Sequence, residues 1–381
     1  MKAFVYRLYP TPSQERQMET VRSVCKDFYN ALLHERKIAC EHGFSVSKNE
    51  QLRRVKELKV LLPAAKGIHS HILQLVASDL DKGFAAFFRR VKSGEKPGYP
   101  RFKNEQRMAG FGFKELGNGF SIDGRRLKLS GIGRIAVRWH RPLQGKTKTV
   151  RIVKRADGWY ACFCCETEPN PLPQTNQEVG VDVGILSLLT TSDGEHTQNP
   201  RWYRKAQKRL RILQRSVARK RKGGSNRKKA IARLARHSLR VQNCRKDFLN
   251  KVANKLIRRY DYIALEDLRI TNMAKNHCLA KSILDAGWGY LVQRLQAKAE
   301  EAARVVVLVN PAYTSQTCSC CGARFENLTL RDRWVNCTCG LSMDRDENAA
   351  RNILSWSRLG YSRWALTQDN GLSVAQEAVP L

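Results

Sequence analysis

The sequence lacks any long apolar stretch. No run of about 18 apolar residues occurs among its 381 residues, which excludes a membrane-spanning helix of ordinary length. The opening segment MKAFVYRLYP also lacks the apolar core of a signal peptide. We therefore expect a cytoplasmic protein that does not act at a membrane.

Acidic residues are also scarce. The chain has 34 Asp and Glu against 69 Lys and Arg, a formal net charge of +35. A protein with this excess repels itself unless a polyanion lies close by. The charge is unlike that of an ordinary metabolic enzyme and favours a nucleic-acid partner. The length is sufficient for about two to three domains with cores of their own.

The 12 cysteines are expected to be reduced, because no export signal accompanies them. Five of them fall between Cys318 and Cys339. Fifteen residues separate Cys321 from Cys337, a spacing typical of a four-cysteine zinc ribbon, whereas buried free thiols are the alternative. Because the second pair is Cys-x-Cys and Cys320 competes with Cys321, the ligand set is open. We favour Cys318, Cys321, Cys337 and Cys339.

Hydrophobic periodicity divides the first part of the chain. Residues 2–9 alternate as a strand does, and Thr11-Pro12-Ser13-Gln14 predicts a capping box that begins a helical segment over 12–92. Short alternating runs then predict a β-rich segment over 93–168. The opening strand has no neighbour of its own, so we expect it to join this later sheet. A proline-rich linker follows over 169–177.

The second part predicts alternating strands and helices. Strands are expected over 179–185 and up to Thr191, which together form a hairpin, and again over 260–268 and 304–309. Helices are expected near 286–303 and after Asp344, which we interpret as a helix cap or as a residue that supports the neighbouring acid.

Residues 201–259 are strongly basic, with 23 Lys and Arg against the single acid Asp247. Glycines at 223 and 224 divide this segment into two helices, which predicts a basic helical hairpin that contacts phosphates. A solvated charged face is the alternative, but such faces usually carry both signs. For Tyr99, Phe102 and Trp139 we favour core packing over base stacking.

Three acids stand where an apolar element should not tolerate them. Asp182 interrupts a strand of valines, Glu266 ends an apolar strand, and Asp346 opens an alanine-rich helix. A buried carboxylate is costly unless it is paired or bound to metal, although the latter two positions have ordinary structural explanations. Converging carboxylates can hold two Mg²⁺ ions about 4 Å apart, which activate water and stabilise the leaving oxygen in phosphodiester cleavage.

Five motifs in this order resemble the TnpB (OrfB) family of transposon-encoded RNA-guided nucleases, which is related to type V CRISPR effectors. The resemblance covers nearly the whole chain and is most specific in the carboxyl half. The motifs are GYPRFK at 98–103, GVDVGI at 180–185, LEDL at 265–268, TSQTC at 314–318 and DRDENAARNI at 344–353.

The resemblance implies a multidomain α+β protein. A β-barrel wedge domain with an inserted α-helical recognition domain would precede a RuvC-like nuclease domain of RNase H fold (α/β), interrupted by a four-cysteine zinc ribbon. The implied boundaries are 1–11 and 93–168 for the wedge, 12–92 for recognition, 169–177 for the linker, 178–313 and 341–358 for the nuclease, 314–340 for the zinc ribbon that binds target nucleic acid, and 359–381 for a tail.

The resemblance also implies an activity, RNA-guided DNA cleavage by an insertion-sequence transposon protein. Such a protein would bind a guide RNA derived from the transposon end and recognise a short adjacent motif in double-stranded target DNA. The family's catalytic acids fall on Asp182, Glu266 and Asp346, with two Mg²⁺ or Mn²⁺ ions there and one structural Zn²⁺ at the cysteines. Arg345 would approach the scissile phosphate.

Further partners and alternatives remain open at this point. The transposase encoded by the same element is a candidate partner, and the implied location is a prokaryotic cytoplasm, on the nucleoid when DNA is bound. A nucleic-acid-binding regulator that never cuts and a strand-transferring transposase are the alternative functions.

Overall fold

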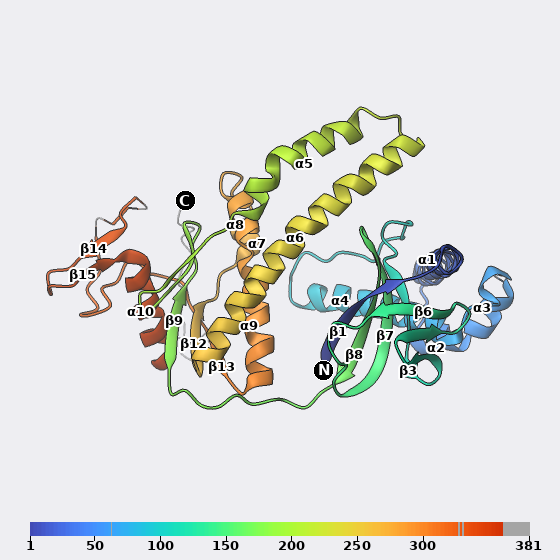
Figure 1. Cartoon of the computed structure of the whole chain (residues 1–381), viewed down its shortest axis with the longest axis horizontal. Coiled ribbons are helices and arrows are strands. Elements are labelled where there is room, and N and C mark those ends of the chain that lie inside the picture. The colour runs from blue at the N-terminus through green and yellow to red at the C-terminus, as the bar shows by residue number, and fades with distance from the viewer. Residues whose placement is uncertain (62, 327, 330, 361–381) are drawn as a thin grey trace. The chain divides into compact units, whose positions relative to one another are not determined.

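The computed structural model describes residues 1–61, 63–326, 328–329 and 331–360 (Figure 1). The chain forms two compact units, residues 1–168 and the residues from 169 on. Each unit contains helices and strands around its own core, which confirms a mixed α+β fold in more than one domain. No helix within these ranges is long and apolar enough to cross a membrane. The predicted tail lies outside the described residues beyond position 360.

The first unit begins with a strand and a group of helices. The predicted capping box is present: the Thr11 hydroxyl accepts from the Gln14 backbone N–H, and the Gln14 side chain accepts from the Thr11 N–H. The helices are α1 (Pro12–Glu41), α2 (Lys48–Arg53), α3 (Val55–Leu61), the 3₁₀ helix η1 (Pro63–Ala65) and α4 (Ser70–Lys92).

Eight strands complete the first unit, in the order β2-β7-β8-β1-β6-β5-β4-β3. The opening strand pairs with β6 on one side and β8 on the other, so the prediction that it joins the later sheet is confirmed. The strands are β1 (Lys2–Tyr9), β2 (Gly110–Phe113), β3 (Glu115–Leu116), β4 (Gly119–Asp123), β5 (Arg126–Leu129), β6 (Gly133–Arg138), β7 (Lys146–Arg155) and β8 (Gly158–Glu166).

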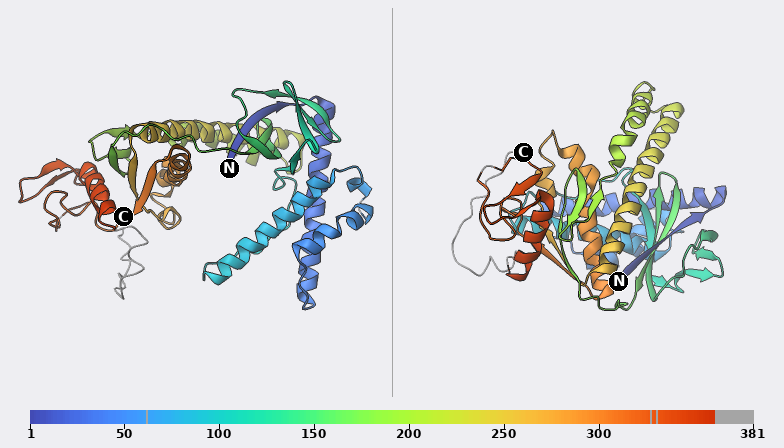
Figure 2. Two further views of the ribbon diagram at one scale, coloured as in Figure 1. Left: turned by 90° about the horizontal axis from the view of Figure 1, so that it is seen from below. Right: turned by 60° about the vertical axis from the view of Figure 1, so that its left-hand side comes forward.

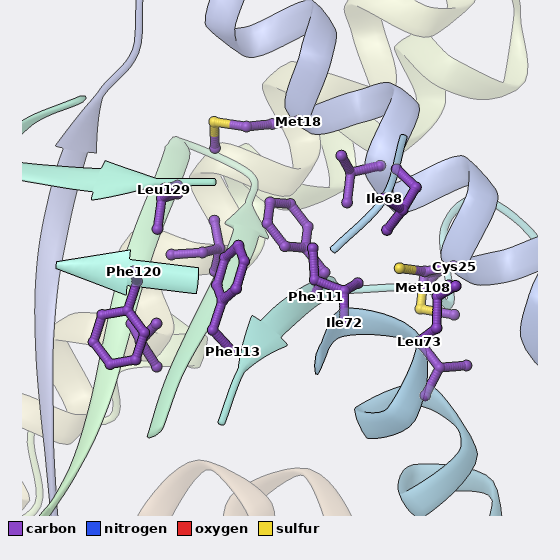
Figure 3. Close-up of a cluster of buried hydrophobic side chains, with 14 of the residues drawn as sticks. Met18, Cys25, Ile68, Ile72, Leu73, Met108, Phe111, Phe113, Phe120 and Leu129 are labelled. Atoms are coloured by element: carbon purple, nitrogen blue, oxygen red, sulfur yellow. The ribbon is translucent and has the colours of Figure 1, made fainter. Parts of the chain in front are cut away.

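An aromatic core joins the sheet of this unit to its helices. Phe111 and Phe113 on β2 and Phe120 on β4 are almost fully buried, and Met18 of α1 and Ile72 of α4 belong to the same cluster (Figure 3). Each ring removes a large apolar area from water, so this core supplies the unit with its main stabilisation.

The second unit is built on a five-stranded sheet in the order β11-β10-β9-β12-β13. The three strands β9, β12 and β13 are parallel, and β10 and β11 are antiparallel additions at one edge, so the predicted hairpin is present. The strands are β9 (Glu178–Asp182), β10 (Ser187–Thr191), β11 (His196–Gln198), β12 (Tyr262–Glu266) and β13 (Val305–Val309).

Helices cover both faces of this sheet, and a short ribbon lies beside it (Figure 2). Strands β14 and β15 pair with each other apart from the main sheet, close to the start of α10. The elements are α5 (Trp202–Ala218), α6 (Ser225–Arg259), α7 (Ile270–Met273), α8 (Ala280–Ala286), α9 (Trp288–Ala302), β14 (Trp334–Asn336), β15 (Ser342–Asp344) and α10 (Arg345–Arg358).

The basic segment forms the expected helical hairpin of α5 and α6 (Figure 1). Buried Asp285 fixes its base. The carboxylate of Asp285 accepts the backbone N–H groups of Tyr203 and Arg204, the latter at 3.3 Å, and pairs with Arg245 of α6 at 2.6 Å. One acid therefore holds the start of α5 and the middle of α6 together, in the way that a carboxylate stabilises a helix N-terminus.

The alternation of the central strands decides which face carries the acids. Val179 and Val181 of β9 pack in the core with α6 and α9. Gly180 points the opposite way, toward α10, where a Cβ would lie 1.9 Å from the Ala350 carbonyl oxygen. Asp182, two positions further, lies on the α10 face as well, because side chains alternate along a strand. The absence of a side chain at Gly180 thus lets α10 approach the sheet.

We predict that Gly180→Ala separates α10 from β9. The added methyl would meet backbone atoms that cannot rotate away, so we expect a loss of about 1–3 kcal/mol in local stability. Hydrogen exchange of the β9 and α10 amides in the full chain measures it. Gly67→Ala is the control, because no atom lies within 4 Å of its added Cβ. Equal exchange in both variants would contradict the close approach.

Candidate active site and zinc centre

Asp182 and Glu266 end two neighbouring parallel strands. Val181 is paired with Leu265 in the register of β9 and β12, so the two acids occupy the next positions side by side. Both side chains are half-buried and lie on the face that α10 covers. The carboxyl ends of parallel strands are where functional groups of an α/β sheet gather.

Asp346 comes to the same place from the first turn of α10. As the sequence predicted, Asp344 caps this helix: its Oδ1 accepts the backbone N–H of Asp346 at 2.9 Å and that of Glu347 at 3.1 Å. The Asp346 side chain is 24% exposed, and its carboxylate lies 4.0 Å from Arg333 Nη1. The three predicted acids therefore come from three different elements of one unit.

The electrostatics of these acids show that they affect one another. Burial raises the pKa of Asp182 well above its ordinary value, and the charges of Glu266 and Asp346 raise it further. Burial likewise raises the pKa of Glu266 to about 7 and also raises the pKa of Asp346. Arg333 and Arg345 offset this negative charge only in part, since the pKa values stay raised. A hard divalent cation relieves negative charge in a half-buried site rich in oxygen atoms. The donor chemistry fits Mg²⁺ or Mn²⁺.

Two side chains near these acids escaped the sequence analysis. The Thr314 hydroxyl donates to Glu266 Oε1 at 2.5 Å. His196 lies opposite Thr190, which lies opposite Asp182, so the three share one face, and His196 Nδ1 is 3.1 Å from the Thr190 hydroxyl. Thr314 stands in the TSQTC motif, which was a usable signal, whereas only the strand register reveals His196.

Arg345, at the start of α10, is held by acceptors of the protein itself. Its guanidinium donates to the carbonyl oxygens of Thr329 and Asp332 and to the Ser315 hydroxyl, at 2.8, 3.5 and 3.3 Å. These protein acceptors occupy guanidinium N–H donors with which Arg345 could otherwise bind a phosphate. Arg345 nevertheless lies close enough for its charge to lower the pKa of Asp182 and Asp346, and Arg333 acts on Asp346 in the same way, so an approach of Arg345 to the scissile phosphate stays a prediction.

The structure gathers the four favoured cysteines into one cluster. The Sγ atoms of Cys318, Cys321, Cys337 and Cys339 all lie within 4.8 Å of one another. The distance is 3.7 Å between Cys318 and Cys339 and 3.5 Å between Cys321 and Cys337. Tetrahedral Zn²⁺ with ordinary Zn–S bonds places its ligands about 3.8 Å apart, so the cluster fits this metal. Cys320 is exposed and lies outside the group.

The aromatic residues divide between core and surface. Trp139 packs against the rings of Tyr6 and Phe163, as expected. Tyr99 and Phe102 are 42% and 47% exposed, so the core interpretation is wrong for both. Tyr99 belongs to an exposed aromatic patch on the end of α4, defined by its ring contacts. The patch consists of Phe87, Phe88 and Tyr99, whose rings contact one another or the buried ring of Phe84 beneath them.

Most of the hairpin's positive charge has no acidic partner among the described residues. Ion pairs with described carboxylates engage four of its basic side chains. These are Arg245, Lys251, Lys255 and Arg259. The remaining basic residues of 201–259 leave a surface of one sign, with exposed members such as Lys228, Lys229 and Arg233 on α6. Such a surface attracts a phosphate backbone.

Most of the chain matches known protein families. Residues 162–277 match the OrfB_IS605 family, described as "Probable transposase", and residues 288–353 match "Cas12f1-like, TNB domain". Residues 1–43 match a "Helix-turn-helix domain" of OrfB_IS605. In this structure that last range holds a strand followed by the single helix α1.

Curated relatives match over nearly the full length. A Streptomyces pristinaespiralis protein described as "Putative RNA-guided DNA endonuclease" is 34% identical over 93% of this chain and 89% of its own. The Escherichia coli (strain K12) protein InsQ, with the same description, is 29% identical over 93% and 92%. The solved structure of the mini-RNA-guided endonuclease CRISPR-Cas_phi3 aligns with 94% of this chain and 92% of its own, at a TM-score of 0.49 and 11% identity. That score is low, so the family assignment rests on the sequence relatives.

We predict one equivalent of zinc per chain. Cys321→Ser should weaken zinc binding by more than about 100-fold, because even outer-shell changes cost about 10–100-fold. Cys320→Ser, the exposed neighbour, should retain one equivalent. Metal analysis combined with chelator competition measures both. Zinc loss from Cys320→Ser with retention in Cys321→Ser would make Cys320 the ligand.

Proposed function

Since the chain belongs to the TnpB (OrfB) family, we propose that it is an RNA-guided DNA endonuclease of an insertion-sequence transposon. It would bind a guide RNA from the transposon end and recognise a short transposon-adjacent motif. It would then hydrolyse phosphodiester bonds of double-stranded target DNA. The observation that carries the proposal is the convergence of Asp182, Glu266 and Asp346 on one face of the sheet, with raised pKa values that reflect burial and unrelieved negative charge.

The proposed domain architecture follows the implied boundaries. The sheet of β1 to β8 would be the wedge (1–11 and 93–168), with α1 to α4 as the inserted recognition domain (12–92). Residues 169–177 would link the wedge to a RuvC-like nuclease domain (178–313 and 341–358), which a zinc ribbon (314–340) interrupts. The contact of β3 with β7 supports a curled, barrel-like wedge, since these strands lie near opposite edges of the sheet.

In the proposed mechanism the three carboxylates hold two divalent cations. When bound, these ions would activate a water molecule and stabilise the leaving oxygen. Asp182 and Glu266 supply ligands from rigid strand ends, and Asp346 supplies one from a capped helix, so the donors keep their positions. Thr314 orients Glu266 through its hydroxyl. Arg333, half-exposed beside Asp346, is placed to approach a phosphate oxygen.

Charge and aromatic surface support the nucleic-acid partners. The hairpin of α5 and α6 offers phosphates a single-signed surface, and the exposed aromatic patch offers bases a stacking surface. Guide pairing would then read the DNA sequence while the protein reads the backbone and a short adjacent motif. We further propose that the protein is located in the cytoplasm, on the nucleoid when DNA is bound, and that the transposase of the element is a candidate partner.

We predict that Asp182→Asn and Glu266→Gln each lower guided cleavage by more than about 100-fold, because loss of a metal ligand costs more than loss of an outer-shell partner. The assay supplies the native RNA, Mg²⁺ and guide-matched DNA. Glu178→Gln is the matched control: it lies on the same strand β9, and its carboxylate pairs with Arg358 at the surface. RNA binding should be unchanged in all three.

Three outcomes of this assay would count against the proposal. Binding without any cleavage by the wild-type protein would favour a regulator that never cuts. Joined rather than free products, formed without RNA, would favour a strand-transferring transposase. Cleavage that survives both acid substitutions would remove these residues from the site.

The hairpin generates a prediction about salt. Replacing Lys228, Lys229 and Arg233 by Gln should reduce the slope of log K against log salt for RNA by about 0.7 for each phosphate that the variant no longer neutralises. Lys251→Gln is the control, because its ammonium already pairs with Asp247 at 2.8 Å. RNA-binding titrations over a range of salt concentrations measure both slopes. An unchanged slope in the triple variant would place the RNA elsewhere.

A further inference from the structure

Residues 314–319 form a short segment between the two candidate metal sites, which we call the strap. It follows β13 and begins at Thr314, whose hydroxyl donates to Glu266 Oε1 at 2.5 Å and is 3.2 Å from the Pro311 carbonyl oxygen. It includes Cys318, a member of the four-cysteine cluster that is 1% exposed. One end of the strap thus contacts an acid, and the other carries a thiol of the zinc centre.

Two buried asparagines of α10 hold the strap by its backbone. Asn352, 3% exposed, donates from Nδ2 to the carbonyl oxygens of Thr314 and Thr317 at 2.8 and 2.6 Å. Asn348, fully buried, donates to the Thr317 carbonyl oxygen at 2.8 Å and accepts the Ser319 backbone N–H at 2.9 Å.

These contacts are demanding in residue type. The Asn amide supplies two N–H donors and an acceptor oxygen at one side-chain end, whereas an Asp carboxylate at either position would set oxygen against carbonyl oxygen. Buried polar groups left without partners are costly, and a side chain kept at such a position must satisfy them all. Asp346 stands in the first turn of the same helix, so α10 carries one of the acids and also holds the strap through its asparagines.

We propose that the strap couples the zinc centre to the carboxylate site, with Thr314, Asn348 and Asn352 as positioning residues. Zinc bound at Cys318 fixes the strap at one end, the two asparagines fix it to α10, and Thr314 then orients the Glu266 carboxylate toward its cation. The inference rests on the proposed function in one respect, namely that the carboxylates bind divalent cations.

The physical basis is the orientation of a metal ligand by its neighbour. Groups that hydrogen-bond a ligating carboxylate fix its direction, and their loss costs about 10–100-fold in metal affinity. In this chain the neighbour of Glu266 is Thr314, which is not part of the sheet that carries Glu266. It is held by α10 and by the loop that leads to Cys318, so its position depends on whether the cysteine cluster is closed.

Manganese binding to the full chain tests this coupling. Mn²⁺ affinity is measured by electron paramagnetic resonance with and without zinc, and Asp182→Asn identifies the binding that belongs to the carboxylate site. In the wild-type protein we expect zinc removal to weaken Mn²⁺ binding about 10–100-fold. Thr314→Val should bind Mn²⁺ as weakly with zinc as without it, and Thr314→Ser should restore both the affinity and its dependence on zinc.

Asn352→Leu tests the attachment of the strap to α10. Its zinc content should remain one equivalent, while its Mn²⁺ affinity becomes independent of zinc. Hydrogen exchange of β9 and β12 shows whether the sheet is intact. If this variant fails to fold, the Thr314 pair decides. Wild-type Mn²⁺ affinity in Thr314→Val, or no effect of zinc removal on the wild-type protein, would overturn the coupling.

The outcome for the coupling is separable from the outcome for the proposed function. Zinc-dependent Mn²⁺ binding without guided cleavage would contradict the endonuclease and leave the coupling standing. Guided cleavage by a protein whose Mn²⁺ affinity does not change on zinc removal or in Thr314→Val would support the endonuclease and contradict the coupling.

Discussion

The second unit has to accommodate three acidic side chains that its fold brings to one face of the central sheet. The parallel register of β9 and β12 sets Asp182 beside Glu266, and α10 approaches closely over Gly180 to bring Asp346 to the same face. Burial raises the pKa of all three acids, and the charges of Glu266 and Asp346 raise the pKa of Asp182 further. Such a site is unfavourable in the absence of a counter-charge. We therefore propose that this edge of the sheet is a cation site.

The opposite sign of charge is arranged elsewhere in the same unit. Asp285 anchors α5 to α6, and beyond this anchor the hairpin presents basic side chains that few described acids neutralise. Negative charge is thereby concentrated at the sheet edge and positive charge on the helices. The basic helices would attract a polyanionic ligand and bring it to cations at the acidic sheet edge. This division of roles is consistent with a nuclease.

Local signals in the sequence were sufficient for the elements and for the gathering of the acids and thiols. Asp182 stood out because it interrupts valines, and Cys321 and Cys337 because of their spacing. Asn352 and Thr314 did not stand out, since their partners are backbone and carboxylate atoms of other elements, which only tertiary packing brings near. Tyr99 was wrongly assigned to the core, because an apolar side chain in a loop does not show whether the loop runs along the inside or the outside of a helical subdomain.

The central claim is that Asp182, Glu266 and Asp346 form one divalent-cation site. Anomalous diffraction from crystals of the full chain soaked in Mn²⁺ tests it most directly. We expect strong anomalous peaks within coordination distance of oxygens from all three carboxylates, and none there in crystals of Asp182→Asn. Crystals in which manganese binds elsewhere, or peaks that persist unchanged in the variant, would contradict it.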